Sequence, residues 1–273
     1  MNILVLMQKE LRDARRNRWF LLYTVVFTGL ALALSWLSLA GVGTYGFAGF
    51  GRTGASLINL VLLIIPLMGL TLGALSLSGE RERGTLLSLL AQPVTPLEVL
   101  LGKYLGLALA ICAALGAGLG FSGLLMAGQG GTADAGAYLH LVLLAVLLAL
   151  TSLSLGVVIS AAVRKGATAI GMALFLWLVL VFLGDLGLMG TALVLRIPIR
   201  DLLWLSFFNP LQVFKMAAIL AMHSSLEVLG PAGLYAVRLY GERLLPLLLS
   251  ILGVWTLIPL LVAYAIFHRR GAL

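Results

Sequence analysis

The stretch "GERERGTLLSLLAQPVTPLEVLLGK", residues 79–103, is the longest segment of the chain whose composition suits water. Acids and bases alternate in its "ERER" start, and apolar runs of more than about twenty residues, the length of a membrane span, flank it on both sides. Pro93 and Pro96 divide it, because proline lacks an amide donor and clashes with the preceding helical turn. Pro96 also suits the first position of a new helix. The segment therefore predicts a short helix held between two long apolar helices.

The rest of the chain is too apolar for a soluble globule. Of its 273 residues, 62% are apolar before the 32 glycines are counted, and only 10% are charged. Soluble domains are about 45–50% apolar with glycine included and about 25% charged. Strand-like alternation is absent, which favours helices over a barrel. We expect an all-α polytopic membrane protein, a single transmembrane domain over residues 1–273, with six spans near residues 19–40, 57–78, 104–127, 138–163, 168–189 and 246–267.

The distribution of lysine and arginine predicts the orientation, because these residues concentrate at cytoplasmic ends of spans. With the N-terminus inside, 12 of the 18 basic residues fall on the cytoplasmic side: Lys9, Arg12, Arg15, Arg16, Arg18, Arg81, Arg83, Lys103, Arg164, Lys165, Arg269 and Arg270. We therefore expect an inner-membrane protein with both termini and residues 79–103 in the cytoplasm. The net charge of +8 then reflects topology and attraction to anionic lipid. Nucleic acid is not an expected partner, since the sequence has no basic face interleaved with aromatics.

Two polar segments have alternative interpretations from chemistry alone. The "GTLLSLL" run places Leu86, Leu87, Leu89 and Leu90 on a short helix, which either receives a push from a soluble partner or lies on lipid headgroups. Residues 1–18 repeat apolar side chains at three- and four-residue steps, which predicts an interfacial amphipathic helix, against a plain basic tail as the alternative. The apolar positions of that repeat are Ile3, Leu4, Met7, Leu11 and Ala14.

Residues 79–103 resemble the segment between helices two and three of the six-helix permease subunits of ABC transporters of the exporter-like class. The resemblance implies that this segment is a cytoplasmic coupling helix and that residues 1–18 are the elbow helix before the first span. It also implies a set of residues that face the ATPase subunit: Glu80, Glu82, Gly84, Thr85, Leu86, Leu89, Leu90 and Pro93.

The chain itself lacks a phosphate-binding loop. The motif G-x-x-x-x-G-K-[ST] fails at Gly102-Lys103, which has no first glycine and is followed by Tyr104. ATP and Mg are therefore expected in a separate ATPase chain, and this chain is expected to be a transport subunit with no cofactor of its own. An enzyme would need a nucleophile with a partnered base, which no cluster in the sequence resembles. A channel would need rings of charge or a filter-like loop, and neither is visible.

Three further stretches, "QKELRDARRNRW", "FFNPLQVFKMAAI" and "LLVAYAIFHRR", are similar to the permeases that support maturation of the copper–sulfur centre of nitrous oxide reductase in denitrification. That resemblance implies a homodimer with two ATPase subunits and a periplasmic accessory protein, embedded in the lipid bilayer. The alternative is a permease that exports a lipid, a drug or a peptide. Copper itself is not expected to bind this chain, since Cu(I) selects thiolates and thioethers, and Cys112 is the single cysteine, with no C-x-x-C or M-x-x-M motif.

Residues 190–245 form the largest expected extracytoplasmic segment, and Asn209-Pro210 predicts a helix start within it, with asparagine as the cap and proline in the first turn. That helix either returns into the outer leaflet, docks a periplasmic protein through Asn209, Pro210 and Phe214, or packs on the bundle as a plain surface helix.

Polar residues inside the expected spans are candidates for a translocation path or for contacts between helices. Asp185 is the strongest of these candidates, because a carboxylate inside the membrane is unfavourable in free energy and is retained mainly where it has a function. The others are Asn59, Thr151, Ser152 and Ser154. Two rows of small residues in the third span predict close helix packing, with a dimer seam as the alternative: Cys112-Gly116-Gly120 and Ala110-Ala114-Gly118.

Overall fold

The computed structural model describes residues 2–40, 49–128, 135–182, 184, 198–222 and 230–270. Within these ranges the chain is helical and has no strand, in agreement with the all-α expectation. Asp185 lies outside the described residues. The helices are α1 Asn2–Ala14, α2 Arg18–Ala40, α3 Gly49–Glu82, α4 Thr85–Leu90, α5 Pro96–Gly128, α6 Ala135–Ala162, α7 Gly166–Phe182, α9 Ile199–Phe207, α10 Pro210–Ala221, α11 Gly230–Tyr240 and α12 Leu244–Arg270, with a 3-10 turn at Gly241–Arg243.

Five of the described helices are long and apolar enough to cross a membrane, in regions that match five of the six expected spans. The region of the other expected span, residues 168–189, holds α7, which is apolar but has only 17 residues. The helices α9 and α10 together would make a sixth candidate, but they bend by 104° at the break between them. The count of six spans therefore stays a prediction, while a membrane-embedded helical protein is supported.

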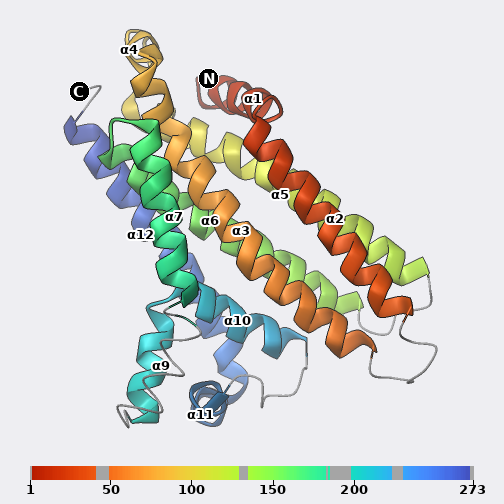
Figure 1. The fold of residues 1–273 in the computed structure, drawn as a ribbon. Helices are drawn as coiled ribbons and strands as arrows, with labels where there is room; N and C mark the ends of the chain where they lie inside the picture. The colour runs from red at the N-terminus through yellow and green to blue at the C-terminus, as the bar shows by residue number, and fades with distance from the viewer. Residues whose placement is uncertain are drawn as a thin grey trace.

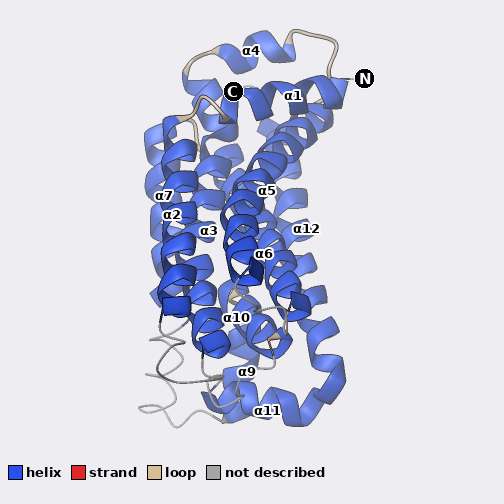
Figure 2. Cartoon of the chain, turned by 90° about the vertical axis from the view of Figure 1, so that its right-hand side faces the viewer, coloured by secondary structure: helices blue, strands red, loops and turns tan. Residues whose placement is uncertain are grey.

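The long helices run side by side, and the short helices lie at the two ends of the bundle (Figure 1). One end carries α1, α4 and the C-terminal end of α12, and we refer to it as the terminal end. There α1 and α4 run across the direction of the long helices (Figure 2). The opposite end carries α9, α10 and α11. Both candidate polar segments of the sequence thus lie at the same end of the molecule.

The two central helices, α3 and α6, cross at backbone contact. A Cβ atom on Gly73 would lie 2.6 Å from the Leu153 carbonyl oxygen, and one on Gly156 would lie 2.5 Å from the Leu70 carbonyl oxygen. Small residues permit this approach, and close van der Waals packing is what holds helices together in lipid. The position of α3 relative to α6 is therefore tightly fixed.

Of the two small-residue rows of α5 that were predicted for helix packing, only the row that contains Gly118 lies against another described helix of the chain. A Cβ on Gly118 would meet the Phe27 ring at 2.6 Å, so that row lies against α2. A Cβ on Gly116 or Gly120 would meet nothing within 4 Å, so their row packs against no described helix of this chain, and its use as a dimer seam stays a prediction. Sequence spacing cannot show which side of an all-apolar helix faces a neighbour.

The helix α1 lies on α5 at two glycines that the sequence analysis did not single out. A Cβ on Gly102 would lie 2.6 Å from the Leu6 Cβ, and one on Gly106 would lie 2.6 Å from the Glu10 Cβ. The buried face of α1 therefore includes Leu6 and Glu10, while Leu4, which was predicted on the apolar face, is 61% exposed. The other predicted apolar positions agree better, since Ile3, Met7 and Leu11 are half-buried and Ala14 is buried.

Candidate functional site

The short helix α4 begins where α3 is broken by a glycine. Gly84 has φ +72°, a left-handed conformation that glycine adopts without the steric cost of a side chain. Next to this turn, the Thr85 hydroxyl donates to the Glu80 carbonyl oxygen at 3.2 Å. After α4, Thr95 and Glu98 cap α5 reciprocally, with the Thr95 amide 2.8 Å from Glu98 Oε2 and the Glu98 amide 3.3 Å from Thr95 Oγ1. Both connections of α4 to the long helices are therefore well defined.

The surface that α4 presents differs from the predicted one. Leu86 is 1% exposed and Glu80 is 8% exposed, so neither can meet a soluble partner in this conformation, and Leu89 and Leu90 are half-buried. Leu87, which was left out, is 62% exposed. Four leucines within six residues surround a helix, so one of them had to face outward. The exposed surface of this segment consists of Arg83, Gly84, Thr85, Leu87, Ser88, Ala91, Gln92 and Pro93, which we call the α4 surface.

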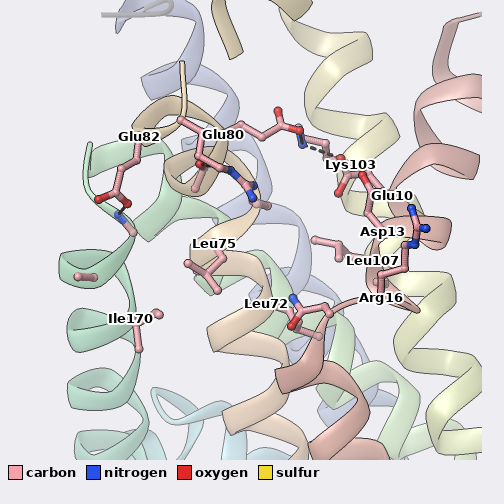
Figure 3. A pocket seen from close by; sticks show the side chains of 17 residues that line it. Glu10, Asp13, Arg16, Leu72, Leu75, Glu80, Glu82, Lys103, Leu107 and Ile170 are labelled. Carbon is pink, nitrogen blue, oxygen red and sulfur yellow. Dashed lines mark hydrogen bonds and ion pairs between the residues drawn. The ribbon is translucent and has the colours of Figure 1, made fainter. Parts of the chain in front are cut away.

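Beneath α4, four charged side chains from three helices form an ion cluster: Lys9 and Glu10 of α1, Glu80 of α3 and Lys103 of α5. Figure 3 shows Glu10, Glu80 and Lys103 of this cluster. The Lys103 ammonium lies 2.6 Å from Glu10 Oε1 and 2.8 Å from Glu80 Oε1. The Lys9 ammonium lies 2.8 Å from Glu80 Oε1. The Lys103 side chain is only 3% exposed. Removal of one partner from such a buried pair typically costs about 3–5 kcal/mol, because it leaves an uncompensated charge.

The ion cluster keeps Lys9 charged. Burial acts to lower the pKa of Lys9, but the hydrogen bond to Glu80 and the attraction of Glu80, Glu10 and Asp13 outweigh it, so that the net pKa lies above its usual value of 10.5. A raised pKa of a cation stabilises the folded state below the unfolded pKa, and the contribution is lost as pH rises through the folded value. Lys9 therefore holds α1 to α3 throughout the physiological range of pH.

A second set of contacts ties the end of α3 to the junction of α6 and α7. The Arg81 guanidinium donates to the Val163 carbonyl oxygen at 2.9 Å and to the Ser160 carbonyl oxygen at 3.4 Å, at the C-terminal end of α6. Glu82 Oε2 accepts from the Gly166 amide at 2.8 Å, at the N-terminus of α7. Both charges suit the dipoles of those helix ends. Glu82 was predicted to face an ATPase; it is exposed and one of its oxygens already accepts from this chain, so the contact with an ATPase stays a prediction.

Two of the three polar residues predicted inside α6, Thr151 and Ser154, form hydrogen bonds with neighbouring helices. The Thr151 hydroxyl lies 2.8 Å from that of Thr256 in α12, and the Ser154 hydroxyl donates to the Tyr104 hydroxyl of α5 at 3.1 Å. Ser152 donates to the Leu148 carbonyl oxygen of its own helix at 2.8 Å and is buried. These hydrogen bonds suit contacts between helices, while a role in a translocation path stays a prediction.

Asn59 of α3 is exposed and lines a different space. It borders a cavity of about 380 Å³ together with Gln212 of α10 and apolar residues of α3, α7 and α10. This cavity lies between the bundle and the short helices of the opposite end, and its polar groups are the two side-chain amides.

At the opposite end, the predicted helix start is confirmed. Asn209 caps α10 by accepting from the Leu211 amide at 3.0 Å, and its own amide donates to the Leu180 carbonyl oxygen of α7 at 2.7 Å. Phe214 is 0% exposed, and Pro210 is also buried. This burial contradicts the prediction that the three residues contact a periplasmic protein, because α10 packs against α6 and α12 of its own chain.

A metal site is not found in the described part of the chain: no group of three histidine, cysteine, aspartate or glutamate side chains is placed there to hold a metal ion. The geometry that these residues do show is an exposed short helix, with ion pairs and hydrogen bonds at its base.

The sequence matches one family model and is similar to two permease proteins along most of its length. The sequence model described as "ABC-2 family transporter protein" matches residues 4–272. The protein named "Probable ABC transporter permease protein NosY" of Stutzerimonas stutzeri is 32% identical over 269 residues, which cover 96% of this chain and 96% of that protein. The protein of the same name from Pseudomonas aeruginosa is 30% identical over 269 residues, with the same coverage.

Proposed function

The chain belongs to the ABC-2 family of ABC transporter permeases, and from this premise we propose that it couples ATP hydrolysis in a separate ATPase subunit to assembly of the copper–sulfur centre of nitrous oxide reductase. In this proposal the chain lies in the inner membrane, and its terminal end faces the cytoplasm. The complex contains two copies of this chain, two ATPase subunits that hold ATP and Mg, and a periplasmic accessory protein. The likeness to the two NosY permeases over 96% of the chain supports the maturation role.

The observation that carries the coupling proposal is the exposed α4 surface on a fixed base. Leu87 projects from α4 at 62% exposure, while Leu86 anchors the same helix at 1%. An exposed leucine beside polar groups is suited to a shallow apolar recess on a soluble partner, since apolar burial drives most association. The ATPase would thus push on α4 without contacting the long helices.

The base of α4 then determines where the push goes. On the α3 side, the ion cluster joins Glu80 to Lys9 of α1 and to Lys103 of α5. The contacts of Arg81 and Glu82 join the same helix end to α6 and α7. A displacement of α4 therefore moves the ends of five helices as a unit.

Leu87→Asp tests this coupling in the assembled complex. We expect the folded protein to be retained, since exposed substitutions away from special contacts change stability by about 0.5 kcal/mol or less. ATPase association in detergent should weaken by about tenfold, because a carboxylate enters an apolar contact. Leu87→Met, which keeps an apolar side chain of similar volume, should bind like the parent protein. Normal association of Leu87→Asp would contradict the coupling surface.

The maturation role is tested by what co-purifies and by the reductase itself. A gentle detergent pull-down from native membranes should recover an ATPase together with a periplasmic protein of the nitrous oxide reductase system, and Leu87→Asp should give reductase with an incomplete copper–sulfur spectrum. An ATPase alone, with a normal reductase spectrum in the variant, would instead favour export of a lipid, a drug or a peptide. Recovery without any ATPase would contradict the coupling proposal as well.

A further inference from the structure

We propose that a cavity at the terminal end binds the headgroup of an aminophospholipid, a lipid that carries both a phosphate and a primary amine. The cavity has a volume of about 790 Å³ and is bounded by α1, the link between α1 and α2, the end of α3, the start of α5 and the start of α7 (Figure 3). Ligand sites in proteins span about 300–1,000 Å³, so a headgroup with the first part of its chains fits the space. The inference goes beyond the proposed function, because it concerns a bound lipid whatever the cargo.

The cavity is polar on one side and apolar on the other. Figure 3 shows Leu72, Leu75 and Ile170 below Glu80, Glu82 and Lys103, with Arg16 across the cavity at the level of Leu72. Because α3, α5 and α7 continue from here into the apolar part of the molecule, the polarity changes in the same direction as in a membrane leaflet. A ligand that matches both parts is an amphiphile with its head toward the terminal end.

One carboxylate oxygen of Glu80, in the wall of the cavity, is a buried acceptor without a hydrogen-bond donor among the described residues. Glu80 lines the cavity, and its side chain is nine-tenths buried. Its Oε1 atom accepts from Lys9 and Lys103, whereas its Oε2 atom is buried and has no hydrogen-bond partner within the described residues. Leaving a buried acceptor unpaired is unfavourable. A primary ammonium supplies three donors, whereas a choline headgroup has no N–H and cannot pair with this oxygen.

The remaining charges suit a phosphate beside that amine. The guanidinium groups of Arg16 and Arg83 line the same cavity, and Arg83 uses its Nε donor on the Gly79 carbonyl oxygen at 3.0 Å. A guanidinium has five donors and binds phosphate through charge-assisted hydrogen bonds. The lining also includes carboxylates that exceed its cations by one, so a headgroup with both charges fits better than a purely anionic one: Glu10, Asp13, Glu80 and Glu82, against Arg16, Arg83 and Lys103.

Native mass spectrometry of the purified full-length chain measures this binding directly. The delipidated protein is titrated in parallel with phosphatidylethanolamine, phosphatidylcholine and phosphatidylglycerol of identical acyl chains. We expect phosphatidylethanolamine to bind at least about tenfold more tightly than phosphatidylcholine, as expected for one charge-assisted hydrogen bond. Equal binding of the three lipids would overturn the proposal.

Paired variants locate the site. Asp13→Asn and Arg16→Gln should each weaken phosphatidylethanolamine binding by about tenfold. Arg12→Gln is the matched control, because Arg12 is exposed on the same helix and does not line the cavity. Glu80→Gln is a weaker test, since Glu80 also belongs to the ion cluster. Unchanged binding in both Asp13→Asn and Arg16→Gln would overturn the assignment to this cavity.

A soluble analogue separates a lipid from a free solute. Glycerophosphoethanolamine carries the same phosphate and amine but no acyl chains. We expect it to compete with phosphatidylethanolamine at least a hundredfold less well, because the apolar part of the cavity then gains no contact. Equal competition would overturn the lipid as the ligand, even though the headgroup chemistry would be the same.

Discussion

A short helix lies across the bundle at each end of the molecule, and the two are held in opposite ways. At the terminal end, α4 buries only Leu86 of its six residues, and its base is fixed by ion pairs among α1, α3 and α5. At the opposite end, α10 buries nine of its twelve residues and is held by apolar packing and a neutral asparagine cap. A helix that is held only at its base can be displaced as a unit, whereas a helix that belongs to the core cannot move without disturbing it.

The largest effect is expected from Lys103→Met. The substitution leaves Glu10 and Glu80 facing each other with no buried cation between them, which should lower the free energy of unfolding by about 3–5 kcal/mol. Thermal unfolding in detergent, followed by tryptophan fluorescence, measures the loss. The double variant Lys103→Met with Glu10→Gln should recover part of it, since one of the two stranded charges is gone. A melting temperature equal to that of the parent would show that charge does not hold the base of α4.

A smaller effect is expected at the opposite end, from Asn209→Ala. The variant loses the cap on the Leu211 amide and the hydrogen bond to the Leu180 carbonyl oxygen. Loss of a cap costs about 1–2 kcal/mol. The melting temperature should fall accordingly. The size of this decrease should not depend on ionic strength, because the lost contacts are neutral. Asn209→Asp keeps the cap on the Leu211 amide but loses the hydrogen bond to the Leu180 carbonyl oxygen. Its melting temperature should lie between those of the parent protein and of Asn209→Ala.

The smallest change in stability is expected from Glu82→Gln. The carboxylate at the N-terminus of α7 becomes an amide, which removes a dipole interaction worth about 0.3–1 kcal/mol but preserves the acceptor. Because this contact lies on the proposed path from α4 to α7, stimulation of the ATPase by the permease should fall by severalfold while the complex still forms. Glu98→Gln, a carboxylate that caps α5 at the surface, is the control. Equal ATPase stimulation in both variants would restrict the coupling path to the ion cluster.

Much of the architecture could be predicted from the sequence. Apolar runs of about twenty residues gave the long helices, and the prolines at 93 and 96 placed the end of α4 and the start of α5 where the structure has them. The Asn209-Pro210 pair placed the start of α10 for a similarly local reason. Each of these signals lies within one turn of the feature that it determines.

The parts that could not be predicted depend on contacts between distant residues. Glu80 is separated from Lys9 by 71 positions, and Lys103 is separated from Glu10 by 93, so nothing in the sequence pairs them. Glu80 therefore looked like a surface charge for a partner, although it lies in the ion cluster. The exposure of Leu87 depended on which leucine of α4 the rest of the chain covers, and that leucine is Leu86. The sequence thus indicated which residues belong to the site, but the direction in which each side chain points could be seen only in the folded structure.

The backbone contact between Gly73 and Gly156 has a mechanical consequence. Further along the same pair of helices, Ser160 Oγ of α6 accepts from the Leu77 and Ser78 amides of α3 at 2.8 Å each. Arg81 then donates to the Val163 carbonyl oxygen at 2.9 Å. The part of α3 from Gly73 to Arg81 is thus bound to α6 along its length, and the two helices form one strut at the terminal end. Pro66, which lacks the amide donor of an interior helix position, lies in α3 beyond this strut. A force applied at α4 is therefore carried by two helices together, and we expect any bend within α3 to occur at Pro66.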